Sequence, residues 1–471
     1  MIVGAPVGDL HLDVHAPFND QLLSRVEMVD WASVERALDT ARTLFRDRSR
    51  WLSPARRMEI LATTAVLMEQ QAEDLALVAA REGGKPLMDS RVEVQRAIDG
   101  VKSCVEILRT DTPVPPPMNL NAASAQRLAL VTREPIGPVL AISAFNHPLN
   151  LIVHQVAPAL AAGCPVLVKP AEDTPRSCFR FVSLLREAGL PEEWCQAFLC
   201  DKQVTGRLVE DARLGFLSFI GSAAVGWMLR AKLAPGTRCA LEHGGVAPVI
   251  VAPDADLQDT LPRLIKGGFY HAGQVCVSVQ RIFAHESMAF SLSESLAQQA
   301  RCLVVGDPTQ PETEIGPLIR KKELQRVHEW VTEAINGGAM CLTGGTPVSS
   351  SCYAPTVLFN PPQKAQVSTR EIFGPVVCVY PYGELDEAIA RANSLPFAFQ
   401  AAVFTRQLDV AMQASRTLDA SAVMINDHTA FRVDWMPFAG LRQSGLGVGG
   451  ILHTFREMQI EKMIVIRSPK L

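Results

Sequence analysis

Apolar residues recur at three- and four-residue spacing through the first hundred positions of this chain of 471 residues. This spacing places them along one face of a helix and predicts three helices, over residues 33–48, 53–81 and 90–108. Ser53 and Pro54 suit the start of the second helix, as a cap followed by a first-turn proline.

A change of pattern follows a proline-rich run at residues 113–117, which predicts a stiff connector. Residues 126–133 then alternate between polar and apolar, as in a half-exposed strand. From residue 137 short apolar runs alternate with helical stretches, and the predicted strands are residues 139–144, 165–169, 195–199, 215–220 and 237–242. Such strands separated by helices are typical of a doubly wound parallel sheet with both faces covered.

A second alternating series begins after residue 245 and predicts a second α/β domain. Its predicted strands are residues 249–252, 280–284, 376–380, 401–404 and 421–425, and its helices are residues 257–269, 286–302, 321–336 and 384–393. Residues 461–467 resemble a strand with no neighbouring partner, so we expect them to join a sheet elsewhere, in this or another subunit.

Composition narrows the class of protein. With 48% hydrophobic and 20% charged residues and a net charge of −4, the chain is typical of a soluble globular protein, and nothing favours nucleic acid or a membrane as partner. Eleven cysteines without a Cys-x-x-Cys pair indicate reduced thiols in the cytoplasm and no metal site. The first ten residues lack a basic start and an apolar run, so we expect no secretory signal.

An uncharged segment, residues 135–168, is long enough to cross a membrane. Four prolines and several amide side chains interrupt it, and these would be costly in a spanning helix. We therefore predict a buried strand, a loop and a buried helix.

Cys276 follows Gly273-Gln274-Val275 among small and β-branched residues. A cysteine in such a setting is most often a small buried hydrophobe. A catalytic thiol needs a neighbouring group that lowers its pKa or removes its proton, because a free thiol is mostly protonated near neutral pH.

Two other polar residues come where predicted strands end. Glu242 follows an apolar run and precedes Gly244-Gly245, so a half-buried carboxylate with a raised pKa, suited to a general base, is expected there. Asn146 follows the strand at 139–144; its amide could begin the next helix or donate to an oxyanion.

The run Gly445-Leu446-Gly447-Val448-Gly449-Gly450 fits the dinucleotide pattern G-x-G-x-x-G. It follows a turn-rich segment and no strand, so the context that the pattern requires is missing. We interpret it as a flexible loop.

Seven short motifs occur in one order along the chain, and together they resemble the aldehyde dehydrogenase superfamily over nearly its whole length. They are Phe145-Asn146-His147-Pro148, Lys169-Pro170-Ala171-Glu172, Phe219-Ile220-Gly221-Ser222, Leu241-Glu242-His243-Gly244-Gly245, Gly273-Gln274-Val275-Cys276, Glu371-Ile372-Phe373-Gly374-Pro375 and Pro437-Phe438-Ala439-Gly440. The chain departs from the family pattern at His243, Ala439 and Ile220, where leucine, glycine and threonine are usual.

The resemblance implies a catalytic role for three side chains. Cys276 attacks the aldehyde, Asn146 and the Cys276 backbone N–H stabilise the oxyanion, and Glu242 activates the water that hydrolyses the thioester. The cofactor residues that it implies are Lys169, Glu172, Gly221, Ser222, Glu371 and Phe373. Glu172 favours NAD, because a carboxylate accepts from a free 2′-OH and repels a 2′-phosphate, and Lys169 leaves NADP as an alternative.

The same resemblance implies an α/β fold of the aldehyde dehydrogenase type, with two doubly wound parallel-sheet domains and a small β extension for oligomerisation. We assign residues 1–113 and 135–244 to an NAD-binding domain and residues 245–427 to the catalytic thiol domain. Residues 114–134 and 428–471 would supply the oligomerisation strands and a substrate-tunnel loop, in a homodimer or homotetramer.

The expected substrate tunnel is rich in cationic and hydrogen-bonding groups. Its residues by this resemblance are Arg96, His147, His154, His428 and Arg432. They suit a short anionic or hydroxylated aldehyde, and the motifs resemble the branch that acts on lactaldehyde, phosphonoacetaldehyde and related anionic aldehydes. Alternatively, Arg432 pairs with Asp434 or a neighbouring subunit; for Arg281 a structural role is favoured.

The leading hypothesis is therefore NAD-dependent oxidation of a small anionic aldehyde, such as phosphonoacetaldehyde, a sulfonated aldehyde, lactaldehyde or a semialdehyde, to its acid. Acyl transfer to coenzyme A is a second hypothesis, against which Glu242 argues. A catalytically silent protein on the same fold is a third.

Overall fold

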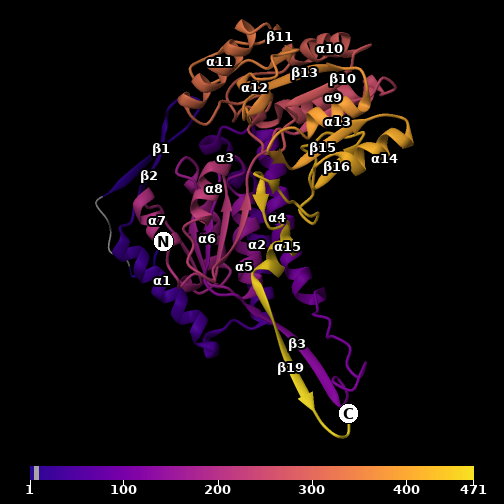
Figure 1. The fold of residues 1–471 in the computed structure, drawn as a ribbon. Coiled ribbons are helices and arrows are strands. Elements are labelled where there is room, and N and C mark those ends of the chain that lie inside the picture. Colours follow the sequence, from indigo (N-terminus) through magenta and orange to yellow (C-terminus); the bar gives the residue numbers. More distant parts are fainter. Residues whose placement is uncertain (5–9) are drawn as a thin grey trace.

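Two open α/β sheets and a projecting two-stranded ribbon make up the protein in the computed structural model (Figure 1). The structure describes residues 1–4 and 10–471. Part of the amino-terminal stretch in which we expect no secretory signal therefore lies outside the described residues.

The first sheet has six strands in the order β18-β8-β7-β4-β5-β6. They are β4 (Val139–Ile142), β5 (Val166–Lys169), β6 (Cys195–Ala197), β7 (Phe216–Ile220), β8 (Arg238–Glu242) and β18 (Gly445–Leu446). The five predicted strands are confirmed and run parallel, whereas β18 comes from the far end of the chain and pairs antiparallel with β8.

Alternation along β4 shows how this sheet is covered on both faces. Val139 and Ala141 lie in a core with the helices that precede and follow the strand. Leu140 and Ile142 lie in a separate core on the other face, with Val34 and Leu38 of the first helix. Successive side chains of a strand point to opposite faces, so a continuous apolar run is what a doubly covered strand requires.

The covering helices match the predicted pattern, except that the last of them was not foreseen and one predicted helix is divided in two. They are α1 (Trp31–Arg46), α2 (Pro54–Gln70), α3 (Ala72–Gly83), α4 (Leu87–Thr110), α5 (Asn150–Ala162), α6 (Pro175–Glu187), α7 (Lys202–Val209), α8 (Ala223–Arg230) and α15 (Ile451–Glu457). The single helix predicted over 53–81 is wrong, because the chain breaks at Gln71, whose φ of −114° and ψ of 18° are not helical. Apolar spacing continues across this break, so the pattern does not reveal it.

The second sheet has seven strands in the order β11-β12-β13-β10-β9-β15-β16. They are β9 (Pro248–Val251), β10 (Arg281–His285), β11 (Met340–Thr343), β12 (Thr356–Phe359), β13 (Val376–Tyr382), β15 (Gln400–Phe404) and β16 (Ala422–Ile425), and the helices of this domain are α9 (Leu257–Phe269), α10 (Ala289–Arg301), α11 (Lys321–Asn336), α12 (Gln366–Thr369), α13 (Leu385–Ala392) and α14 (Leu408–Thr417). Only β11 is antiparallel, at one edge. The sequence pattern missed β11 and β12.

A long ribbon leaves the body of the molecule at the lower end of the view (Figure 1). Its strands β3 (Arg127–Pro135) and β19 (Gln459–Arg467) pair antiparallel over nine residues. The partner of the predicted carboxyl-terminal strand is thus the predicted strand at 126–133 of the same chain. A smaller hairpin, β1 (His11–His15) with β2 (Leu22–Glu27), was not foreseen.

No helix in residues 1–4 and 10–471 has the length and apolarity needed to cross a membrane. The uncharged segment 135–168 forms β4, the loop, α5 and β5, as predicted. All thirteen residues of α5 are buried.

A buried ion pair positions α5. The Glu93 carboxylate on α4 accepts from the Lys85 ammonium at 2.5 Å, and neither side chain is exposed. Its other oxygen accepts from the backbone N–H groups of Leu149 and Asn150, at 2.9 and 3.0 Å. These are orphan donors of the first helical turn, so Glu93 serves as the cap that the helix lacks in its own sequence.

Replacing Glu93 by alanine should lower the free energy of unfolding by about 3–5 kcal/mol, the usual cost of leaving one buried charge unpaired. Urea denaturation followed by circular dichroism measures this change. The double variant Glu93→Leu with Lys85→Met serves as control and should recover most of the loss; if it is no more stable than the single variant, the loss comes from the missing cap of α5 and not from the unpaired Lys85 charge.

Candidate active site

One cavity of about 650 Å³ lies where the carboxyl ends of the first sheet's strands face the second domain. Parallel strands that end at the same edge bring their following residues together, which is where open α/β sheets bind ligands. Of the residues predicted from sequence, the cavity is lined by Arg96, Asn146, His147, His154, Lys169, Glu172, Gly221, Ser222, Glu242, Cys276, Glu371, Phe373 and Arg432.

The loop that carries Cys276 has an unusual backbone. It leaves α9 through the short helix η3 (Tyr270–Gly273), in which His271 and Ala272 have φ of 49° and 53°. Gly273 also has a positive φ, and a side chain there would collide with the carbonyl of Gly374. Left-handed backbone at two residues other than glycine persists only where surrounding contacts enforce it, so the loop is held in one strained conformation.

The Cys276 thiol is partly exposed to the cavity. Burial and the negative charge of Glu242 raise its pKa, while the positive charge of Arg432 opposes them. The resting thiol is therefore protonated and needs a base to become a nucleophile.

Asn146 lies in the loop between β4 and α5 and is 5% exposed. One hydrogen of its amide nitrogen donates to the carbonyl of Gln274 at 2.9 Å. An amide nitrogen carries two hydrogens, so this bond fixes the group and leaves one donor for an oxyanion.

Glu242 ends β8 and lines the same cavity as Cys276. Burial raises its pKa and the charge of Arg432 lowers it. Gly449 lies behind the carboxylate, where a side chain would stand 3.0 Å from Oε2 of Glu242.

Gly445–Leu446 therefore has a defined place beside the base. It forms β18, which pairs with Leu241 and Glu242. The interpretation of residues 445–450 as a flexible loop is wrong for residues 445–446, which form a strand. A strand of two residues, one of them glycine, leaves no hydrophobic pattern in the sequence. None of the six lines the cavity, so they do not form a nucleotide cradle there.

The cofactor half of the cavity fits a dinucleotide. The Lys169 ammonium lies 3.6 Å from the Glu172 carboxylate, and Gly221 and Ser222 precede α8, whose N-terminus favours phosphate. Burial raises the pKa of Glu371 to about 8. Its Oε1 has no hydrogen-bond partner among the described residues, which suits an acceptor of ribose hydroxyls.

His243, a departure from the family pattern, is accommodated beside this half. Its Nδ1–H donates to the carbonyl of Gly221 at 2.9 Å, and its ring lies edge-on to those of Phe219 and Trp227. Gly226 on α8 makes room, because a side chain at that position would overlap the imidazole. No pattern in the sequence predicts this contact.

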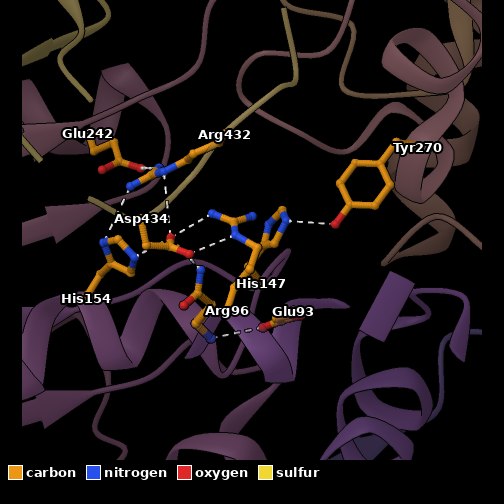
Figure 2. A network of polar contacts seen from close by, with 9 residues as sticks. Glu93, Arg96, His147, His154, Glu242, Tyr270, Arg432 and Asp434 are labelled. Carbon is orange, nitrogen blue, oxygen red and sulfur yellow. Dashed lines mark hydrogen bonds and ion pairs between the residues drawn. The ribbon is translucent and has the colours of Figure 1, made fainter. Parts of the chain in front are cut away.

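A carboxylate organises the substrate half. Asp434 accepts two hydrogen bonds from the Arg96 guanidinium, at 2.8 and 2.9 Å, and one from Nε2–H of His154 at 2.7 Å (Figure 2). These partners hold the pKa of Asp434 well below its usual range, against the effect of burial. Arg96 and His154 reach the cavity as predicted, but they are already bound to a carboxylate that sequence reasoning considered only as a partner of Arg432.

Arg432 lies between this network and Glu242 (Figure 2). Its nitrogens are 3.8 Å from the Glu242 carboxylate and 3.9 Å from that of Asp434. Its guanidinium carbon lies 3.5 Å from the centre of the Phe438 ring. The pairing with Asp434 that we considered as an alternative is thus a contact of charges without a hydrogen bond.

Three further predicted residues have different places. His147 lines the cavity, with Nε2 3.3 Å from the Tyr270 hydroxyl. His428 does not line it: its imidazole is 4.0 Å from Asp427, and its β carbon packs against Gly267. Arg281 donates to the carbonyls of Arg391 and Ala392, which is the structural role we favoured.

The sequence model of the aldehyde dehydrogenase family matches residues 7–464. This chain belongs to the aldehyde dehydrogenase family. It is 36% identical over 456 residues to the 3-sulfolactaldehyde dehydrogenase of Priestia aryabhattai, covering 97% of this chain and 94% of the relative.

Solved structures of the family share the whole fold of this aldehyde dehydrogenase. Aldehyde dehydrogenase 21 from Physcomitrella patens, in complex with the reaction product succinate, superposes with a TM-score of 0.95 at 32% identity, over 99% of this chain and 97% of that one. Glyceraldehyde-3-phosphate dehydrogenase from Methanocaldococcus jannaschii, complexed with NADP, gives 0.93 at 32% identity, over 98% and 100%. The protein is therefore an oxidoreductase with the predicted α/β fold.

Gly244 tests the dinucleotide half of this aldehyde dehydrogenase site. A side chain at that position would overlap the Glu371 carboxylate, so Gly244→Ala should raise the dissociation constant for NAD at least about tenfold. Isothermal titration calorimetry measures the constant. Gly383→Ala is the matched control, because a side chain there meets nothing within 4 Å; equal constants for the two variants would contradict the assignment.

Proposed function

We propose that this aldehyde dehydrogenase oxidises a small anionic aldehyde to its carboxylic acid with NAD, through a thioester on Cys276. The observation that carries the proposal is that Cys276, Glu242 and Asn146, 34 to 130 residues apart in sequence, line one cavity with the dinucleotide-type residues.

In the first step the Cys276 sulfur bonds to the aldehyde carbon. The thiol proton goes to Glu242, whose burial makes it a stronger base than an exposed carboxylate. The aldehyde oxygen becomes an oxyanion, for which Asn146 has a donor in place. A bound dinucleotide would supply the oxidation there as acceptor of a hydride from the substrate carbon, and the product of that oxidation is a thioester on Cys276.

In the second step water hydrolyses the thioester. Once Glu242 has released the thiol proton to solvent, it takes a proton from the water as the water oxygen bonds to the acyl carbon, and the Cys276 sulfur leaves as thiolate. The acid product forms, and the thiolate recovers its proton. Glu242 is therefore required for turnover even where acylation occurs without it.

NAD is the proposed cofactor and NADP the alternative. Glu172 beside Lys169 would accept a 2′-hydroxyl, while the lysine would also accept a 2′-phosphate. Glu371 and Phe373 would hold the second ribose; Phe373 is kept in a left-handed conformation with its ring edge-on to Phe145.

A short anionic substrate is favoured by the charge and size of the other half. Arg96, His154 and Arg432 surround it, and His147 completes the lining. The similar proteins whose names include 3-sulfolactaldehyde or the product succinate also act on or hold small anions, which supports the proposal.

We propose a cytoplasmic homodimer or homotetramer that assembles through the ribbon of β3 and β19. The ribbon exposes apolar side chains that would otherwise stay in contact with water: Leu128, Leu130, Met463, Ile464, Val465 and Ile466. Such an exposed apolar strand edge is typical of a subunit contact.

Glu242→Gln should separate the two steps. Without the base, hydrolysis should slow about 10²–10⁴-fold, the usual contribution of general base catalysis. Stopped-flow absorbance should then show a slower burst of up to one NADH per active site, because the thiol proton has to pass to solvent, followed by near arrest, with an acyl group on Cys276 in the mass spectrum. Cys276→Ser is the control and should give no burst; steady turnover by Glu242→Gln would contradict the assigned role.

Anionic aldehydes should be preferred over uncharged ones of the same length. A charge-assisted bond to an arginine predicts kcat/KM about 10- to 100-fold higher for aldehydes with sulfonate, phosphonate or carboxylate tails than for alkyl ones. NADH formation without coenzyme A measures this ratio and excludes acyl transfer to coenzyme A. Preference for the alkyl series would contradict the anionic substrate.

A further inference from the structure

The charged groups at the substrate end of the cavity do not share hydrogen bonds equally. Arg96 is bound to Asp434 by two hydrogen bonds, and His154 by a third. Arg432 makes only one among the described residues, from Nη2 to Nδ1 of His154 at 3.4 Å. Its Nε–H is buried without any hydrogen-bond partner there.

The only tautomer of His154 that fits both contacts is neutral. Its Nε2 must carry the hydrogen, because the Asp434 carboxylate accepts, and its Nδ1 must then accept from Arg432. Burial lowers the pKa of His154, which favours the same state. His154 therefore adds no positive charge with which to bind an anion.

The nearest negative charge to Arg432 is the catalytic base. Nη1 of Arg432 lies 3.8 Å from Oε1 of Glu242, close enough for strong attraction but too far for a hydrogen bond. Stacking on the Phe438 ring holds the guanidinium in this plane. Arg432 thus stabilises the ionised form of Glu242, while all its donors but the one to His154 stay unused among the described residues.

Charges balance in the free site. Arg96 and Arg432 supply two positive charges, and Asp434 and Glu242 supply two negative ones. An anionic group on the substrate adds a negative charge in a largely buried space, where an uncompensated charge is costly. Proton uptake by Glu242 restores the balance, and the reaction requires that proton transfer.

We propose that Arg432 is shared between Glu242 and the anionic group of the substrate: the anion takes over the guanidinium, and Glu242 is thereby released to act as the base. This inference rests on the proposed function and adds a mode of regulation to it. An anionic substrate then switches on the base that processes it, whereas a neutral aldehyde leaves Glu242 held by Arg432.

A linkage between anion binding and protonation follows. Weakening the contact with Arg432 raises the pKa of Glu242. Above this raised pKa Glu242 stays ionised and is a stronger base; below it the anion binds with uptake of a proton, and its affinity rises as the pH falls. The groups that face Glu242 are Arg432 and Asp434 from the loop before β17 (Leu441–Arg442), Arg96 from α4 and Cys276 from the catalytic loop. His154 from α5 contacts Arg432.

The test is binding of ethanesulfonate, a sulfonate without a carbonyl, to the full-length protein saturated with NAD, measured by calorimetry across a series of pH values. For the wild type, affinity should rise by up to about tenfold per pH unit on lowering the pH, the limit for uptake of one proton. Glu242→Gln has lost the competing charge, so it should bind about as tightly as the protonated wild type at every pH.

Arg432→Gln should bind ethanesulfonate at least about tenfold more weakly, through loss of a charge-assisted contact. Arg406→Gln is the control and should behave as the wild type, because Arg406 is 68% exposed and pairs with Asp256 outside the cavity. The pH dependence is measured on the wild type alone, so the inference can be tested even if a variant does not fold.

Three results would overturn the inference: wild-type affinity that does not change with pH, a Glu242→Gln variant with the same pH dependence as the wild type, or undiminished binding by Arg432→Gln. Absence of ethanesulfonate binding would overturn it as well. The proposed function has its own test: it is contradicted if the wild type forms no NADH from any of the anionic or alkyl aldehydes.

Discussion

Four buried charges that cancel in pairs are the constraint on which the site depends. Asp434 holds Arg96 by two hydrogen bonds, whereas Arg432 and Glu242 attract each other without one. Ions taken out of water are tolerated only when compensated, so each position depends on the other three. Because the first pair is bonded and the second is not, the first is a fixed support and the second can respond to a ligand.

The fold brings these charges together from distant segments. Arg96 comes from α4, Glu242 from the end of β8, and both Arg432 and Asp434 from the loop after β16. The capping of α5 by Glu93 fixes the helix that presents His154. Strained backbone before Cys276 fixes the proposed nucleophile opposite them. A rigid frame around one weakly held pair is therefore the arrangement that the packing produces.

Much of this could be predicted from sequence because the informative patterns are local. Continuous apolar runs gave the strands of both sheets, and residues at strand ends, such as Asn146 and Glu242, were expected at one edge. Family motifs then placed Cys276 beside them. The break at Gln71 was missed, because helical spacing continues across it, and β18 was missed because it has only two residues.

The substrate half was harder to predict for a physical reason. Which carboxylate a buried arginine selects depends on three-dimensional proximity, and Arg96 lies 338 residues from Asp434. The basic residues expected in the tunnel could be listed from sequence. That list could not show that Arg96 and His154 are already bound to Asp434. His428 belongs to the same run of sequence, yet it turns toward Asp427. The positive charges of the predicted tunnel residues favoured an anionic substrate. They could not show that Arg432 is the cation whose donors remain available to bind it.

The contact between His243 and Gly226 makes two distant positions interdependent. The imidazole fills the space above α8 that a β carbon at residue 226 would need, while its Nδ1–H secures the carbonyl of Gly221. A methyl group at 226 is therefore compatible only with a smaller side chain at 243, and a histidine at 243 demands glycine opposite it. Among homologues these two sites should covary, and any redesign of the turn at Gly221 has to treat them as a unit.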